Sequence, residues 1–209
     1  MVRVNALIIV DVQNDFIPGG ALPTRNGAEV VPVINRLQND FPLIVATQDW
    51  HPQNHGSFAS NHPGKKPGQM IELGGLPQVL WPDHCVQGSK GAEFHRDLDM
   101  RRIAKVIRKG TDPQIDSYSG FFDNGRRKAT GLEDYLRGQR VTAVYIAGLA
   151  TDYCVLWTAG DAKRLGFETH VIADACRGVE LKPGDIERAF EEMRSSNIDV
   201  LTAASVEKR

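Results

Sequence analysis

The sequence is poor in cysteine and has no long apolar run. Its three cysteines, an odd number at irregular spacing in 209 residues, exclude a dense disulfide framework and favour a reducing compartment. No apolar stretch approaches the length of a membrane-spanning helix, and the N-terminus lacks the long apolar segment and the cleavage site of a signal peptide. These absences predict a soluble, cytoplasmic protein.

An excess of charge of one sign is also missing. The formal net charge is −1, so the chain lacks the electrostatic footprint of a protein that binds nucleic acid or an anionic membrane surface. We therefore expect a small-molecule partner. Composition does not shift along the chain, which predicts a single domain over residues 1–209. The sequence has no usable interface signal, and it leaves a homo-oligomer open.

Short apolar runs alternate with segments of helical periodicity along the chain. Strands are predicted at residues 6–10, 42–47, 104–110, 141–147, 168–173 and 198–202. Helices are predicted at residues 28–41, 132–136, 155–165 and 185–195. Continuous apolar strands that alternate with helices indicate a mainly parallel central sheet covered on both faces. We therefore expect a three-layer α/β/α architecture.

A cysteine lies where one of these strands passes into a helix. Cys154 follows the run 141–147, and Thr151 or Asp152 is suited to cap the helix, which places the cysteine in the first turn. The unpaired N–H groups of that turn favour a thiolate, the attacking species, and can also hold an oxyanion. The alternative is a small buried hydrophobe, the usual role of a free cysteine.

A carboxylate and an ammonium group occupy two other strand ends. Asp11 follows the run 6–10, and Lys109 closes the run 104–110. Alone, each has an ordinary explanation, because a strand-end aspartate often forms a turn and a lysine is usually solvated. Parallel strands, however, bring their carboxyl ends to one crevice, which is where ligands bind in open α/β sheets. We therefore expect both side chains to meet Cys154.

Residues 48–90 read as a long loop region that holds potential metal ligands. The segment is rich in glycine and proline and poor in periodicity, which in a compact domain usually marks a functional loop. Asp49 and His51 stand two apart and project from the same side of an extended backbone, and His84 offers a third ligand. Such a set leaves coordination positions open for water or substrate. Solvated histidines bonded to backbone are the alternative, and Cys85 is either a soft ligand or a packing residue.

Five motifs carry a resemblance to a known family. They are IVDVQNDF at residues 9–16, TQDWHP at 47–52, WPDHCV at 81–86, RKG at 108–110 and GLATDYCV at 148–155. With them the sequence resembles, over essentially its whole length, the cysteine hydrolases of the isochorismatase-like superfamily and, within these, the nicotinamidases. The resemblance implies the isochorismatase-like hydrolase fold. It also implies a cis peptide bond between Leu149 and Ala150.

The resemblance also implies roles for single residues. Asp11, Lys109 and Cys154 would form the catalytic set, which the whole superfamily shares. The backbone N–H groups of Ala150 and Cys154 would form the oxyanion hole. The implied metal ligands are Asp49, His51 and His84, with His55 as a possible fourth; this set is more discriminating, because other members of the superfamily generally lack it. The implied substrate pocket contains Phe16, Trp81 and Tyr118.

The activity implied is the hydrolysis of nicotinamide to nicotinic acid and ammonia through a thioester on Cys154, as part of NAD salvage, with pyrazinamide as a further substrate. One divalent metal ion is implied, with zinc the first choice and iron or manganese as alternatives, because the ligand type alone does not choose. A rival reading is another isochorismatase-like amidase that binds no metal. A noncatalytic binding protein with the same fold is the alternative from a different class.

Overall fold

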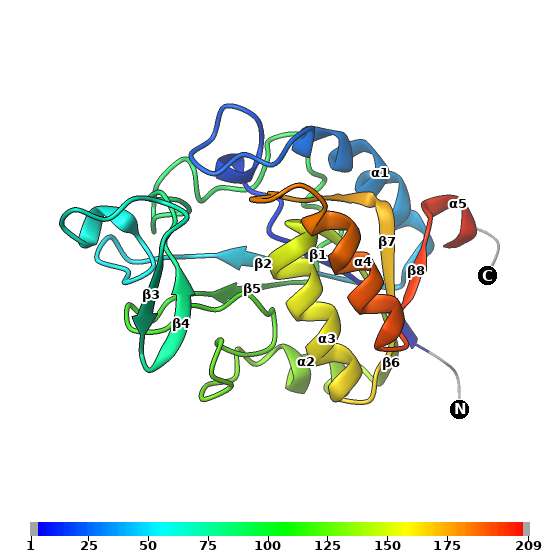
Figure 1. Cartoon of the computed structure of the whole chain (residues 1–209). Coiled ribbons are helices and arrows are strands. Elements are labelled where there is room, and N and C mark those ends of the chain that lie inside the picture. Colours follow the sequence, from blue (N-terminus) through cyan, green and yellow to red (C-terminus); the bar gives the residue numbers. More distant parts are fainter. Residues whose placement is uncertain (1–3, 207–209) are drawn as a thin grey trace.

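The computed structural model of the chain describes residues 4–206, which are organised around one six-stranded sheet (Figure 1). The strands of the sheet are β1 (Val4–Val10), β2 (Leu43–Asp49), β5 (Lys105–Lys109), β6 (Val141–Leu149), β7 (Glu168–Arg177) and β8 (Asp199–Leu201). Their order is β5-β2-β1-β6-β7-β8, and every neighbouring pair is parallel. The expected parallel sheet is confirmed.

Helices cover both faces of this sheet. The α-helices of residues 4–206 are α1 (Val30–Leu37), α2 (Leu132–Gly138), α3 (Leu156–Arg164), α4 (Asp185–Ser195) and α5 (Ala203–Val206). Figure 1 shows α1 on one face and α2, α3 and α4 on the other. The short α5, which the sequence did not predict, packs against β7 in the same apolar cluster as α1. The three-layer α/β/α arrangement is confirmed.

Strand β1 shows why the sequence selects this architecture. Leu7 and Ile9 pack into the cluster on the α1 face, whereas Ile8 and Val10 pack into the cluster on the opposite face. All four side chains are fully buried, and burying each of them stabilises the fold by roughly 1.5–3 kcal/mol. A strand with two apolar faces fits only the middle of a covered sheet, where β1 lies between β2 and β6.

One pair of strands was missed within the predicted loop region. Strands β3 (Met70–Leu73) and β4 (Leu76–Val79) form an antiparallel hairpin in residues 48–90. The Gly74–Gly75 pair makes the turn with two positive φ angles, a conformation in which glycine is favoured. The hairpin lies beyond the carboxyl ends of β2 and β5, at the left of Figure 1. The Gly-Gly pair is the signal from which it could have been predicted.

Two of the sequence-level absences can be compared with the structure. The three cysteines are buried free thiols, in keeping with a chain that folds without disulfides. Among the helices of residues 4–206, none combines the length and the apolarity needed to cross a bilayer.

Candidate active site

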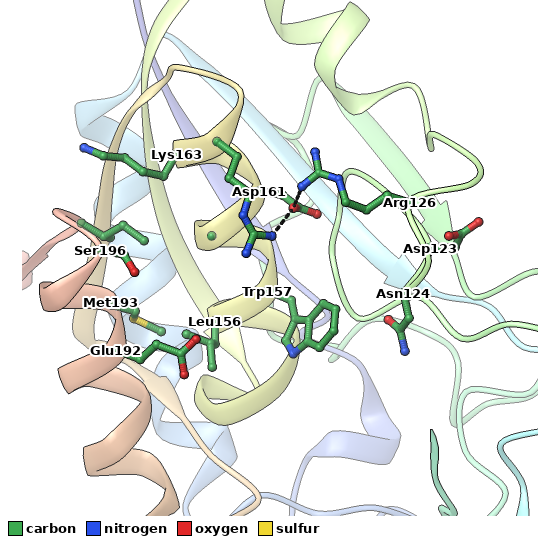
Figure 2. Close-up of a pocket in the computed structure, with 13 residues that line it drawn as sticks. Asp123, Asn124, Arg126, Leu156, Trp157, Asp161, Lys163, Glu192, Met193 and Ser196 are labelled. Carbon is green, nitrogen blue, oxygen red and sulfur yellow. Dashed lines mark hydrogen bonds and ion pairs between the residues drawn. The ribbon is translucent and has the colours of Figure 1, made fainter. Parts of the chain in front are cut away.

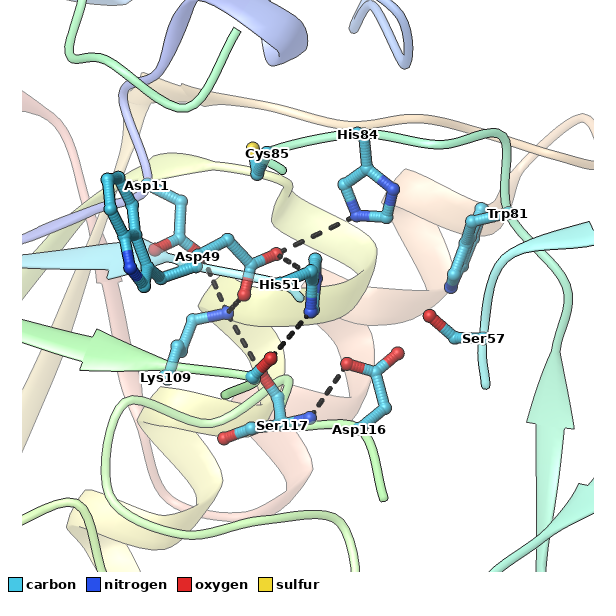
Figure 3. A network of polar contacts seen from close by, with 12 residues as sticks. Asp11, Asp49, His51, Ser57, Trp81, His84, Cys85, Lys109, Asp116 and Ser117 are labelled. Atoms are coloured by element: carbon cyan, nitrogen blue, oxygen red, sulfur yellow. Dashed lines mark hydrogen bonds and ion pairs between the residues drawn. The ribbon is translucent and has the colours of Figure 1, made fainter. Parts of the chain in front are cut away.

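Lys109 is the centre of a buried polar network at the carboxyl edge of the sheet. Its Nζ lies 2.9 Å from Asp11 Oδ2, 2.7 Å from Asp49 Oδ1 and 3.4 Å from Cys154 Sγ, and it donates to the Ser117 carbonyl at 2.9 Å. Figure 3 shows the ammonium group between the two carboxylates. Burial lowers the pKa of Lys109, but the two carboxylates outweigh burial and raise it well above its usual value. The lysine is therefore a fixed positive charge.

Asp11 stands at the end of β1, where the chain turns with a positive φ of 47°. Its Oδ1 accepts a hydrogen bond from the Thr47 hydroxyl at 2.7 Å, and its Oδ2 faces Lys109. Burial raises the pKa of Asp11, and the Lys109 charge offsets only part of that effect. A carboxylate with a raised pKa is a better proton acceptor than an exposed one, which suits a general base.

Cys154 lies in a different local structure from the one expected. Residues Thr151–Val155 form a π-helical turn ahead of α3, and no side chain caps this turn. The capping prediction was wrong, because the Asp152 carboxylate instead accepts hydrogen bonds from the backbone of Val179 and Glu180. The electrostatic prediction also needs correction. Burial raises the pKa of the Cys154 thiol well above its usual value, and Lys109 only partly counters it.

The resting cysteine is therefore a thiol that needs a base, and a carboxylate lies close enough to serve as that base. Oxygen or sulfur atoms of Asp11, Asp49 and Cys154 all lie within 4.8 Å of one another. Asp49 is unsuited to take the proton, because Lys109 and His51 overcome the effect of burial and lower its pKa. Of the two carboxylates, Asp11 is the one whose pKa is raised. The geometry thus brings together the three side chains that the sequence predicted.

The three expected metal ligands also converge. Asp49, His51 and His84 are buried, and their ligand atoms lie within 4.8 Å of one another. The Nε2 atoms of His51 and His84 approach the same oxygen, Asp49 Oδ2, at 3.3 and 3.8 Å. The other carboxylate oxygen, Oδ1, faces Lys109. One aspartate therefore joins the metal-ligand set to the catalytic set.

The orientation of the two imidazoles fits a metal ion. His51 Nδ1 and His84 Nδ1 each lie 2.8 Å from a backbone carbonyl, those of Gly110 and Pro82. A carbonyl only accepts hydrogen bonds, so each Nδ1 carries a proton, and each ring, when neutral, presents the Nε2 lone pair toward Asp49. Burial lowers the pKa of His84, whereas Asp49 overcomes burial and raises the pKa of His51. His51 Nε2 is a buried atom without a hydrogen-bond partner among the described residues. Two lone pairs and a carboxylate oxygen suit a divalent cation.

His55 lies beside this set, with its ring centroid 4.3 Å from that of His51. Its Nδ1 is 2.7 Å from the Ser57 hydroxyl and accepts a hydrogen bond from the Ser57 backbone, while its Nε2 is buried without a hydrogen-bond partner among the described residues. Burial, with His51 adding to it, lowers the pKa of His55 to about 4. The ring is therefore neutral, and the expectation that it is a fourth ligand stays a prediction.

Gln13 positions Asp49 and was not predicted from the sequence. Its Oε1 accepts from the Asp49 backbone N–H at 2.8 Å, and its Nε2 donates to the Asp49 carbonyl at 2.8 Å and to the Ala92 carbonyl at 2.9 Å. The side chain is fully buried. It thereby ties the end of β2 to the loop at residue 92. A glutamine two residues after Asp11 gave no sequence signal, because its role depends on a contact 36 residues away.

The Gly110→Ala substitution is expected to damage the metal site. Gly110 has a φ of +65°, and a Cβ there would lie 2.4 Å from His51 Cε1 and 2.7 Å from His51 Nδ1. The imidazole must move, so we expect metal affinity to fall by about 10-fold or more, as when a supporting contact of a ligand is lost. Isothermal titration with zinc measures this effect. The matched control is Gly64→Ala, which has a φ of +80° and no atom within 4 Å of the added Cβ. Equal zinc affinity in both variants would contradict the assignment.

A pocket opens directly above these groups. It is lined by Phe16, Leu22, Asp49, Trp81, His84, Asp116, Tyr118, Ala150, Tyr153, Cys154 and Val179. Phe16, Trp81 and Tyr118, the three aromatic residues expected at the substrate, all lie in this wall. Tyr153, whose ring packs edge-on against those of Trp81 and Tyr118, was not predicted. Aromatic walls with a nucleophile and a ligand set at the base suit a flat ring that carries a reactive group.

The expected oxyanion site borders the same pocket. The peptide bond between Leu149 and Ala150 is cis, which confirms the expectation drawn from the resemblance. Ala150 and Cys154 both line the pocket, and strand β6 delivers them to its floor. The close approach of strands β6 and β1 requires Gly148, because a Cβ there would lie 2.1 Å from the Val10 carbonyl oxygen. The role of the two N–H groups stays a prediction.

A larger hollow lies away from this chemistry. It has a volume of about 570 Å³ and is bordered by α3, α4 and the loop at residues 123–126 (Figure 2). Asp161, Arg126 and the half-exposed Trp157 contribute to its wall. None of the predicted catalytic or metal-binding residues lines it. The larger hollow is therefore not the candidate active site, because the reactive groups lie in the smaller aromatic pocket.

Comparisons with known proteins agree with this geometry. The sequence model of the isochorismatase domain matches residues 5–205. A curated nicotinamidase of Escherichia coli K12 is 50% identical over 207 residues, with 97% of each chain covered. The solved structure of an Acinetobacter baumannii nicotinamidase and pyrazinamidase superposes with a TM-score of 0.95 at 46% identity, covering 99% of each chain. A Pyrococcus horikoshii pyrazinamidase, solved in complex with zinc, gives a TM-score of 0.77 at 43% identity, covering 95% of this chain and 98% of the other.

Proposed function

The chain belongs to the isochorismatase family, and on that premise we propose that it is a nicotinamidase, which hydrolyses nicotinamide to nicotinic acid and ammonia. The observation that carries the proposal is the position of Lys109, which contacts Asp11, Asp49 and Cys154 at once. It joins a nucleophile and its base to a set of metal ligands inside one aromatic pocket. An amidase that works without a metal ion would not need the metal-ligand set.

The first half of the reaction uses Asp11, Cys154 and Lys109. Asp11 takes the proton of the Cys154 thiol, and the Lys109 ammonium, 3.4 Å from the sulfur, stabilises the thiolate. The thiolate attacks the carboxamide carbon, and the N–H groups of Ala150 and Cys154 stabilise the oxyanion that forms. Protonated Asp11 then gives its proton to the amide nitrogen. The C–N bond breaks, ammonia leaves, and a nicotinoyl thioester remains on Cys154.

The second half returns the enzyme to its resting state. Asp11, now ionised again, takes a proton from water as that water attacks the thioester carbonyl. The C–S bond breaks, nicotinic acid is released, and protonated Asp11 returns its proton to the Cys154 thiolate. Asp11 thus acts as a base and then as an acid in each half of the reaction. Its burial beside a fixed positive charge suits both states, because the two influences act on its pKa in opposite directions.

Asp49, His51 and His84 would hold one divalent metal ion, with His55 as a possible further ligand. When bound, such an ion would supply a Lewis-acid site for the ring nitrogen of the substrate and would help to orient the ring. We propose zinc, the ion bound in the Pyrococcus pyrazinamidase, with iron or manganese as alternatives of similar ligand preference. Phe16, Trp81 and Tyr118 would enclose the ring. Pyrazinamide, which carries the same carboxamide on a related ring, is a second expected substrate.

The setting of the reaction follows from the same reasoning. Buried free thiols suit a reducing compartment, so we place the enzyme in the cytoplasm, where it would return nicotinamide to NAD synthesis. A homo-oligomer is compatible with the proposal, since every catalytic group named above comes from a single chain.

Removal of the metal is expected to abolish most of the activity. After treatment with a chelator and removal of the complex, turnover of nicotinamide should fall by about 10²-fold or more, because the substrate loses its orienting contact. Added zinc or manganese should restore it. Ammonia release, followed together with elemental analysis of the protein, measures both quantities. Full turnover by protein shown to be free of metal would favour a different amidase of the same family.

A further inference from the structure

Asp116 is a buried carboxylate that the proposed reaction does not use. It is 3% exposed and lies in the loop between β5 and α2. Its Oδ2 accepts a hydrogen bond from Gln78 Nε2 at 3.0 Å, and its Oδ1 accepts one from the Ser117 backbone N–H at 2.8 Å. Both oxygens thus accept from N–H donors, which suits an ionised carboxylate. The neighbouring Ser117 carbonyl is the one that receives the Lys109 ammonium.

Among the described residues, no lysine or arginine pairs with Asp116. Asp11 and Asp49 pair with Lys109, and Asp161 pairs with two arginines. The buried Asp123 also lacks an ion pair, but it accepts hydrogen bonds from three backbone N–H groups. A buried ionised group without an opposite charge destabilises the folded protein. A protein keeps such a group only where something compensates it, and here the structure indicates what that is.

The carboxylate faces the metal-ligand set. A ligand atom of Asp116 lies within 4.8 Å of those of His51 and His55, and Asp116 lines the same pocket as Asp49 and His84. Figure 3 shows it next to His51, on the opposite side of that ring from Asp49. His55, whose buried Nε2 has no hydrogen-bond partner in residues 4–206, belongs to this second group of potential ligands.

The charges of the buried cluster point to a divalent ion. When the imidazoles are neutral, as binding of a metal ion requires, and Cys154 is protonated, the charged groups are the carboxylates of Asp11, Asp49 and Asp116 and the ammonium of Lys109. Three negative charges and one positive charge leave two negative charges, which one divalent cation balances. Without Asp116 the same ion would leave the cluster with a net positive charge in a low-dielectric interior.

We propose that Asp116 is the charge-balancing residue of the metal site: its carboxylate makes the buried cluster electrically neutral when a divalent ion is bound, and so strengthens the binding of that ion. This inference rests on the proposed function, which supplies the metal. The inference assigns to Asp116, which is outside the expected ligand set, an effect on the affinity for the metal ion. Asp116 acts on the ion's affinity and is not assigned a part in bond making or breaking.

The test is the zinc affinity of the purified protein and its Asp116→Asn variant, measured by competition with a chelator of known affinity. Asparagine keeps the shape of the side chain and removes the charge. We expect the dissociation constant for zinc to rise by about 10-fold or more, the range found when supporting groups of metal ligands are removed. The matched control is Asp112→Asn, an exposed aspartate of the same loop, which should bind zinc as the unaltered protein does.

A second readout separates this role from a purely structural one. Since the carboxylate has no lysine or arginine partner, metal-free Asp116→Asn should melt at the same temperature as the metal-free parent or higher, while its gain in melting temperature on adding zinc should shrink. A lower melting temperature in the metal-free state with unchanged zinc affinity would show that Asp116 merely holds its loop, and would overturn the inference. If the parent protein binds no zinc, the metal dependence of the proposed function fails as well.

Discussion

Cys154→Ala is expected to abolish nicotinamide hydrolysis, with turnover falling by at least about 10⁴-fold, because covalent catalysis ends when the nucleophile is removed. The fold should survive. The side chain lies in the small turn ahead of α3, and the lost sulfur costs on the order of 1 kcal/mol. Ammonia release under saturating nicotinamide measures the first quantity, and thermal melting measures the second.

Cys176→Ala is the matched control for this variant. Cys176 is also a buried free thiol, and burial raises its pKa to about 12, yet it lies on β7 and does not line the aromatic pocket. We expect Cys176→Ala to keep close to full activity. Turnover by Cys154→Ala that matches that of Cys176→Ala would rule out Cys154 as the nucleophile.

Lys109→Met is expected to lower both turnover and stability. Turnover should fall by about 10³-fold, because the thiolate and the oxyanion lose their fixed positive neighbour. The free energy of unfolding should fall by about 3–5 kcal/mol, since two buried carboxylates are left without a partner. From the sequence alone, a loss of turnover far larger than the loss of stability would be expected of an active-site lysine. The complete burial of Lys109 between Asp11 and Asp49 revises that expectation.

The double variant Asp11→Asn/Lys109→Met separates the two effects. Removing one of the unpaired carboxylates should restore part of the lost stability, as measured by denaturant unfolding. It should restore none of the turnover, because the base is now missing as well as the positive charge. Recovery of activity together with stability would show that Lys109 serves folding alone.

The sequence was sufficient to predict that Asp11, Lys109 and Cys154 converge, for a topological reason. Asp11, Lys109 and Cys154 lie far apart along the chain, but each follows or ends a strand that the apolar pattern identifies. A parallel sheet brings all carboxyl ends to one edge, so strand ends predict proximity without any knowledge of side-chain contacts. The closeness of Asp49 and His51, the proposed metal ligands, was predicted from their local spacing, because residues two apart on an extended backbone project from the same side.

What the sequence did not reveal depends on contacts between distant segments. Gln13 and Asp116 act through the backbone of Asp49 and through charge balance with an ion, and neither effect leaves a local pattern. The prediction that Asp152 caps the helix was wrong, because its carboxylate instead accepts hydrogen bonds from the backbone at residues 179–180. The prediction of a thiolate at Cys154 was wrong, because it considered the helix terminus alone, whereas burial in the folded pocket raises the pKa of the thiol.

The central claim is that Cys154 carries the substrate as a thioester, and acid quenching of the enzyme during turnover of nicotinamide tests it most directly. Peptide mapping by mass spectrometry should find one nicotinoyl group on the peptide that contains Cys154, and none on that peptide in Cys154→Ala. Rapid turnover with no acyl group on any peptide, or with the group on a different residue, would contradict the account.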